Sequence, residues 1–99
     1  MTIAHAETAE QVGEYLASLL RGRGDVSKLY VLRSHELIEL WLLIAPATID
    51  AEVELHSLQR RLLERFPSNS LDLRILDVSR LGHGGVYAAV PRDAIQIEI

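Results

Sequence analysis

The sequence contains no cysteine, and aromatic residues make up only 5% of it. Without cysteine, the chain has no disulfide framework, no thiolate metal site and no cysteine nucleophile. Basic residues are a minority, since ten Lys and Arg against fourteen Asp and Glu give a net charge of −4. This balance disfavours a nucleic-acid binder, which needs clustered positive charge.

Long apolar segments are also missing. The longest run, residues 40–45, ends before Pro46 and is far too short to span a bilayer, so no membrane association is expected. The first residues lack the basic opening and apolar core of a signal peptide, and the expected location is the cytoplasm. The 99 residues, 48% hydrophobic and 24% charged, predict one α+β domain over residues 1–99.

Two segments have the apolar spacing of amphipathic helices. The first extends from about Ala9 to Leu20, and Thr8 with Gln11 three residues later fits a capping box. The second is expected to have Asp50 as its cap and to end near residue 66. Its core stripe is apolar at helical spacing and consists of Leu55, Leu58, Leu62, Leu63 and Phe66.

Alternating hydrophobicity predicts strands over residues 28–33, 37–44, 71–78 and 94–99, the last at a sheet edge. The connection between the first two is so short that they form an antiparallel hairpin. A short helical turn is expected over residues 86–90. The order is therefore α-β-β-α-β-(short α)-β, which gives a mixed or antiparallel sheet of about four strands with helices mainly on one face. In the second strand the core face consists of Ile38, Leu40, Leu42 and Ile44.

Histidines and glycines give no strong site. The four histidines lack the spacings that place two metal ligands on one element, and no metal site is predicted from them. Residues 82–85, Gly-His-Gly-Gly, could present backbone N–H groups to an anion, with Arg80 and His83 adding charge. The alternative is that this segment is a flexible surface connection.

Two strand carboxylates are the remaining candidates for chemistry. Glu39 interrupts an apolar strand, and Asp72 has the equivalent position near the start of the third strand. Carboxylates on neighbouring strands could hold Mg²⁺ together with substrate phosphates. The alternative is that both carboxylates point into solvent on an uncovered sheet face.

The order of elements resembles that of the minimal nucleotidyltransferases of bacteria. Residues 31–34, Val-Leu-Arg-Ser, lie where that family has a Gly-Ser turn, and this match makes Arg33 and Ser34 candidate ligand-binding residues. Residues 37–41, Leu-Ile-Glu-Leu-Trp, lie where it has Asp-x-Asp, and Asp72 lies where it has its third acid. Residues 86–99 are similar to its short helix and closing strand.

The chain departs from the family pattern at the residues that perform catalysis. Arg33 replaces the turn glycine, Leu37 replaces the first metal-binding acid, and the second is Glu39 rather than Asp. The basic, glycine-containing loop between turn and acids is missing. Because the family uses these acids to hold metal over a triphosphate, the resemblance implies a degenerate, catalytically silent member.

The leading interpretation is a non-catalytic binding or interaction domain without a cofactor, which forms a homodimer or binds another protein. The alternatives are a Mg²⁺-dependent nucleotidyl or phosphoryl transferase using Glu39 and Asp72, and a purely structural oligomer subunit. Two helices are not expected to cover both sheet faces, so an apolar patch should remain exposed as an interface. The expected interface residues lie on the second strand and the closing strand: Leu37, Trp41, Leu43 and Ile97.

Overall fold

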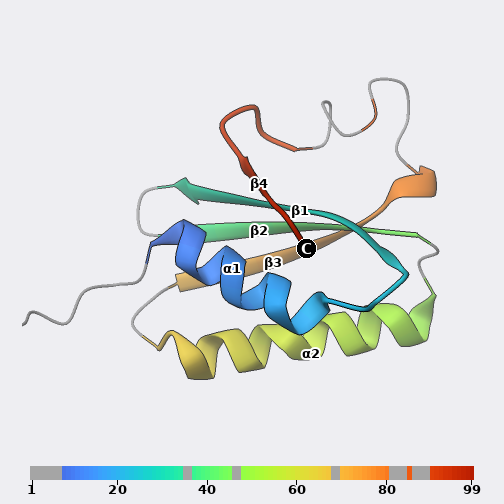
Figure 1. Cartoon of the computed structure of the whole chain (residues 1–99), viewed down its shortest axis with the longest axis horizontal. Helices are drawn as coiled ribbons and strands as arrows, with labels where there is room; N and C mark the ends of the chain where they lie inside the picture. Colours follow the sequence, from blue (N-terminus) through green and yellow to red (C-terminus); the bar gives the residue numbers. More distant parts are fainter. Residues whose placement is uncertain (1–7, 35–36, 46–47, 68–69, 81–84, 86–89) are drawn as a thin grey trace, which may run out of the picture.

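Two helices pack on one face of a four-stranded mixed sheet, the α+β architecture that the sequence predicts (Figure 1). The computed structural model describes residues 8–34, 37–45, 48–67, 70–80, 85 and 90–99. The described elements, in chain order, are α1 (Ala9–Leu20), β1 (Val26–Ser34), β2 (Leu37–Ile44), α2 (Ile49–Arg65), β3 (Ser70–Asp77), the 3₁₀ turn η1 (Val78–Arg80) and β4 (Ile95–Ile97). Within these residues, neither helix has the length and apolar content needed to cross a membrane.

The strand order in the sheet is β3-β2-β1-β4. β1 and β2 form the predicted antiparallel hairpin, and β4 pairs antiparallel with β1 at the predicted edge position. β2 and β3 are parallel because α2 carries the chain back along the sheet between them. The last strand is shorter than predicted, and the predicted turn over residues 86–90 falls almost entirely outside the described residues.

A threonine caps the start of each helix. Thr8 Oγ1 accepts a hydrogen bond from the Gln11 N–H at 3.1 Å, and Gln11 Oε1 accepts one from the Thr8 N–H at 2.8 Å, which confirms the capping box. In α2 the cap is Thr48, whose Oγ1 accepts from the Ala51 N–H at 3.0 Å. The prediction of Asp50 as the cap is wrong, because Asp50 lies in the first turn, where its carboxylate faces the positive end of the helix dipole.

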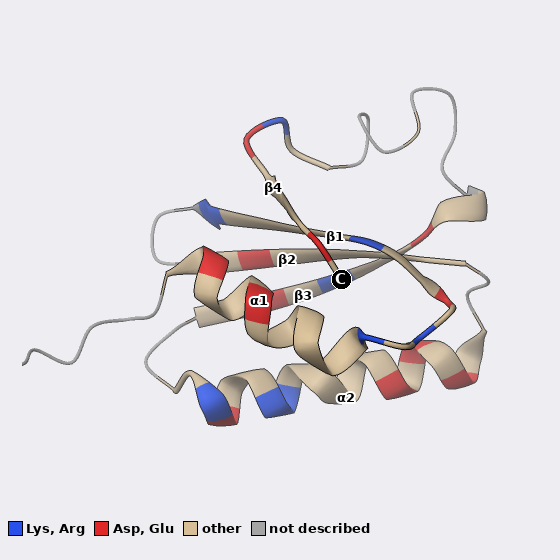
Figure 2. Ribbon diagram, viewed as in Figure 1, with Lys and Arg blue, Asp and Glu red and all other residues tan. Residues whose placement is uncertain are grey.

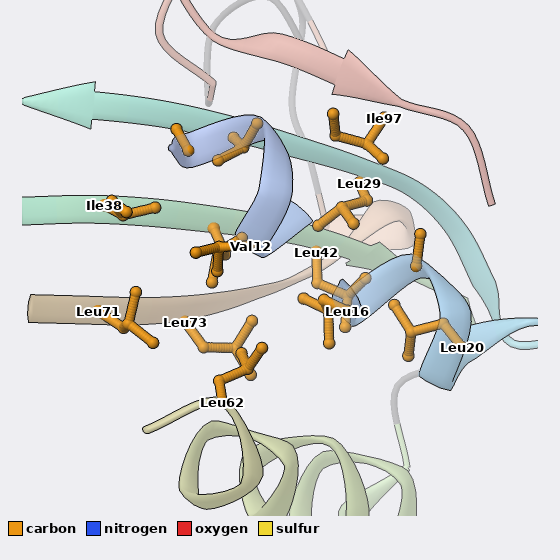
Figure 3. Packing of buried hydrophobic residues seen from close by; sticks show 14 of the residues in the cluster. Val12, Leu16, Leu20, Leu29, Ile38, Leu42, Leu62, Leu71, Leu73 and Ile97 are labelled. Carbon is orange, nitrogen blue, oxygen red and sulfur yellow. The ribbon is translucent and has the colours of Figure 1, made fainter. Parts of the chain in front are cut away.

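The main hydrophobic core lies between the sheet and the helices (Figure 3). Leu16 of α1 packs over the middle of the sheet, and Leu62 of α2 lies against Leu73 of β3 (Figure 3). Leu63, predicted to widen this core, is exposed because it lies on the outer side of α2. The predicted core face of β2 is confirmed, since its four residues are fully buried: Ile38, Leu40, Leu42 and Ile44.

Helix α1 approaches β4 closely at a glycine. A Cβ atom on Gly13 would lie 2.9 Å from Ile97 Cγ1, a separation that side chains do not tolerate without movement. Ile97 is consequently buried against α1 and belongs to the main core. The prediction that Ile97 is part of an exposed interface is therefore wrong.

Candidate functional site

The sheet face opposite the helices carries a group of charged and aromatic side chains from β2 and β3. In the parallel register of these strands, Glu39 is paired with Asp72, and Trp41 is paired with Arg74. The prediction that the two carboxylates lie on neighbouring strands is confirmed. We refer to Glu39, Trp41, Asp72 and Arg74 as the Arg74 cluster.

One guanidinium group binds both carboxylates of the cluster. Arg74 Nε donates to Asp72 Oδ2 at 2.8 Å, and Arg74 Nη2 lies 3.1 Å from Glu39 Oε1. The same guanidinium lies over the indole of Trp41, with its Cζ atom 4.7 Å from the ring centroid. A cation in this position is attracted to the negative face of the aromatic ring. Arg74 therefore offsets one of the two negative charges of the acid pair and lies over one face of the tryptophan.

The electrostatics of the cluster favour the charged form of the arginine. The hydrogen bond that Arg74 donates to Asp72 is the main cause of a raised Arg74 pKa, partial burial opposes it, and the charges of Asp72 and Glu39 add to it. Glu39 is the most enclosed of the ionised groups, with a side chain that is only 13% exposed. A carboxylate so enclosed requires a charged partner, and Arg74 provides it.

This arrangement leaves little capacity for a catalytic metal. Mg²⁺ binds through carboxylate oxygens and keeps several waters or phosphate oxygens as further ligands. One oxygen of each carboxylate already accepts from Arg74, and the guanidinium places a positive charge beside any cation that approaches the acid pair. Within the described residues there is also no group of three or more acidic, histidine or cysteine side chains that could hold a metal.

Trp41 and Leu43 are buried, contrary to the prediction of an exposed apolar patch. Trp41 is 8% exposed and Leu43 is 1% exposed, while Leu37 is half-buried. Trp41 and Leu43 belong to a second, smaller hydrophobic cluster with Val90, and several partly buried residues pack against it, namely Tyr30, Leu76, Val78 and Ala94. Val78, Val90 and Ala94, which follow β3 in the chain, therefore help to cover Trp41 and Leu43, and these two positions provide no exposed interface.

One polar atom in this second cluster is unsatisfied. The Trp41 indole Nε1 is buried and has no hydrogen-bond partner among the residues that the structure describes. A buried donor without an acceptor costs about 1–3 kcal/mol relative to a paired one. Indole N–H groups in protein interiors usually find an acceptor. The contacts that hold this ring are instead the apolar packing of the second cluster and the guanidinium of Arg74.

The candidate anion-binding residues are not brought together. Arg33 is exposed and pairs with Ile38 near the end of the sheet where β1 finishes, and Ser34 is the next residue. Arg80 belongs to η1, which follows β3 at the opposite end of the sheet. The two ends are separated by about 20 Å or more, given a rise of about 3.3 Å per strand residue. His83 lies outside the described residues.

A second ionic group, which the sequence analysis did not predict, joins the α1–β1 connection to α2. Arg23 Nη2 lies 2.8 Å from Asp25 Oδ2, and Arg23 Nη1 lies 2.9 Å from Glu54 Oε2. The hydrogen bond from Arg23 holds the pKa of the Asp25 carboxyl below its usual value. The sequence places a basic and an acidic residue two positions apart, at 23 and 25, and this spacing could have predicted their ion pair. The ion pair with Glu54 depends on how α2 packs and has no local pattern.

Comparison with known proteins adds no relative. No protein-family model, curated protein or solved structure matches the chain.

Proposed function

We propose that this chain is a non-catalytic interaction domain built on a degenerate nucleotidyltransferase-like core. The observation that supports this function most directly is the double pairing of Arg74 with Glu39 and Asp72. Nucleotidyl transfer requires carboxylates that hold metal ions over a triphosphate. Here the acid pair binds an internal cation that belongs to the fold.

Two departures from the family pattern further support the absence of catalysis. The first acid of the family pattern is replaced by Leu37, whose side chain is half-buried beside Glu39 on β2. The turn glycine is replaced by Arg33, whose long side chain occupies a position where close approach of a phosphate would require a glycine. Restoring activity would therefore require several simultaneous substitutions.

The interaction role is supported by where apolar side chains remain exposed. They lie outside the Arg74 cluster, on the outer side of α2 and around β4: Ile49, Val53, Leu63, Ile95 and Ile99. Exposed aliphatic side chains that gather on one element are typical of surfaces that bind other proteins.

An NMR titration that follows the Trp41 signal of the Arg74 cluster tests this proposal. Trp41 is the single tryptophan of the chain, so its indole N–H gives one isolated NMR signal beside Glu39 and Asp72. MgCl₂ and nucleoside triphosphates are added at millimolar concentration while this signal and the backbone amides are followed. We expect no saturable shifts at Trp41, Glu39 or Asp72.

The matched control is the double variant Glu39→Gln and Asp72→Asn, which removes both charges and keeps the side-chain shapes. The alternative, a Mg²⁺-dependent transferase, requires saturable shifts in the native protein that disappear in this variant. That result would overturn the proposal.

A further inference from the structure

Helix α2 presents an apolar stripe to solvent on the side opposite its buried residues. Ile49 is 79% exposed, Val53 is 64% exposed and Leu63 is 42% exposed. Together with exposed His56 and Arg60 they follow a spacing of four, three, four and three residues. This is the spacing by which one helix packs along another in a coiled coil. The stripe is distinct from the side of α2 that contacts the sheet, where Ala51, Leu55 and Leu62 are buried.

Charge is distributed unequally along the same helix. Its first half carries Asp50, Glu52 and Glu54, and its second half carries Arg60, Arg61 and Arg65 with a single acid. In Figure 2 the ribbon of α2 is coloured for acidic residues toward its start and mainly for basic residues toward its end. Glu54 already binds Arg23, which leaves Asp50 and Glu52 as the acids available to a neighbour.

We infer that the partner of this interaction domain is a second copy of the chain, docked through the exposed stripe of α2 in antiparallel orientation. This inference rests on the proposed function and names the surface and the partner. An antiparallel helix pair sets the acidic half of each copy against the basic half of the other, whereas a parallel pair sets like charges together. The helix dipoles are also opposed in this arrangement.

The sequence of the stripe is self-complementary under a two-fold axis near His56. That axis places Ile49 of one copy beside Leu63 of the other, at both ends of the helix pair. It also places Glu52 opposite Arg60 of the other copy. A two-fold axis closes the assembly at two copies, because each stripe is used once.

The expected dimer is weak because the contact is small. Helix α2 has 17 residues and is about 25 Å long at 1.5 Å per residue. One helix per copy gives an interface at the low end of specific protein contacts, where association is transient. The contact has a polar centre at His56 and Arg60, so its apolar part is confined to the ends.

Sedimentation velocity of the whole chain tests the surface. We expect the native protein to be a monomer–dimer mixture at about 100 μM, and Val53→Glu to weaken association at least about tenfold. The control is Ile95→Glu, which changes a comparably exposed aliphatic residue beside the sheet edge. Circular dichroism of each variant verifies folding, and since both positions are exposed, neither substitution opens a cavity.

Cross-linking tests the orientation, and the chain is suited to it because it contains no native cysteine. His56→Cys lies at the axis and should form a disulfide-linked dimer. Ile49→Cys alone should not, because in the antiparallel pair its two copies are about 21 Å apart along the helices, whereas a disulfide needs Cα atoms within about 7 Å. Ile49→Cys mixed with Leu63→Cys should form the linked heterodimer.

Three outcomes overturn the inference. A native protein that is monomeric at this concentration removes self-association altogether. Loss of the dimer in Ile95→Glu but not in Val53→Glu assigns the interface to the β4 edge. Efficient cross-linking of Ile49→Cys to itself shows a parallel pair. None of these results changes the Mg²⁺ titration, so the failure of this inference and the failure of the non-catalytic function are distinguishable.

Discussion

The two faces of the sheet are stabilised in different ways. On the helix side, residues from α1, α2 and all four strands form one continuous core in which most side chains are fully buried. On the opposite side, a small apolar cluster around Trp41 and Leu43 adjoins an arginine that binds two carboxylates. The first face therefore provides most of the folding free energy, and the second face has the residues that set its chemical character.

The two faces also differ in how their side chains are partnered. On the opposite face Arg74 lies over Trp41 and contacts both acids, and Val90 with its neighbours packs against Trp41. The helix side is therefore held by apolar packing, whereas the opposite face combines a small apolar cluster with ion pairs.

The largest effect is expected from Leu40→Ala on the helix side. Leu40 is fully buried in the middle of β2, and truncating it leaves a cavity that the two flanking strands cannot close. We expect a loss of about 2–5 kcal/mol in the free energy of unfolding, measured by urea denaturation. A loss below about 1 kcal/mol would contradict the assignment of this face as the main core.

A smaller effect is expected where α1 meets the sheet edge. Gly13→Ala introduces a Cβ atom 2.9 Å from Ile97 Cγ1, and the helix must move or Ile97 must change rotamer. Overpacking of this kind costs about 1–3 kcal/mol, and the better helix propensity of alanine returns about 1 kcal/mol. We therefore expect a net loss of about 1 kcal/mol in urea denaturation, within those two ranges.

Ile97→Ala in the Gly13→Ala background is the matched test. It removes Cγ1 and Cδ1, the two Ile97 atoms that the new Cβ meets, so the two substitutions together should cost less than the sum of their separate effects. If the losses in unfolding free energy of the two single variants simply add in the double variant, the contact between α1 and β4 is not close.

The ionic group beside the helix layer should make stability depend on pH. Because Arg23 lowers the pKa of Asp25, the folded state favours the ionised carboxyl, and this contribution is present above the ordinary aspartate pKa of about 3.9. It is lost as the pH falls through the lower pKa of the folded state. The group is partly exposed to solvent, so we expect less than about 1 kcal/mol.

Urea denaturation of the native protein and of Asp25→Asn between pH 7 and pH 3, about 1 unit below the ordinary aspartate pKa, measures this contribution. The difference in unfolding free energy between the two proteins should be constant near neutral pH and should shrink in acid. A difference that grows as the pH falls would contradict the lowered pKa.

Local patterns in the sequence were sufficient for the helix-side architecture. The capping box at Thr8 and Gln11 and the alternation in β2 depend on residues within a few positions of each other, and both were confirmed. The burial of Trp41 depends on Val90 and Ala94, about fifty residues further along the chain, at the end of the predicted helical turn and the start of the predicted last strand. No local pattern contains that contact.

The positions of the two acids in the candidate site were predictable from the sequence, but their pairing with Arg74 was not. Alternation placed Glu39 and Asp72 on one face of adjacent strands, and the structure confirms their pairing. The role of Arg74 was not predicted, because alternation put it on the same face without indicating that its side chain turns back over both acids. Side-chain direction of this kind is decided by the neighbours, Trp41 above all, rather than by strand periodicity.

The smallest effect is expected from Trp41→Phe, which tests how the sheet face opposite the helices is stabilised. The substitution keeps an aromatic ring under Arg74 but removes the Nε1–H donor, which is buried and has no partner within the described part of the chain. Loss of buried ring area is destabilising, and removal of an unsatisfied donor is stabilising by about 1–3 kcal/mol, so the two effects largely cancel. We expect the free energy of unfolding to change by no more than about 1 kcal/mol in urea denaturation, far below the value for most large-to-small core substitutions.

Trp41→Leu is the matched comparison, because it removes the same donor together with the aromatic face that Arg74 covers. A large loss in Trp41→Phe would show that the indole N–H has an acceptor, and that this face is held by a hydrogen bond rather than by packing and charge.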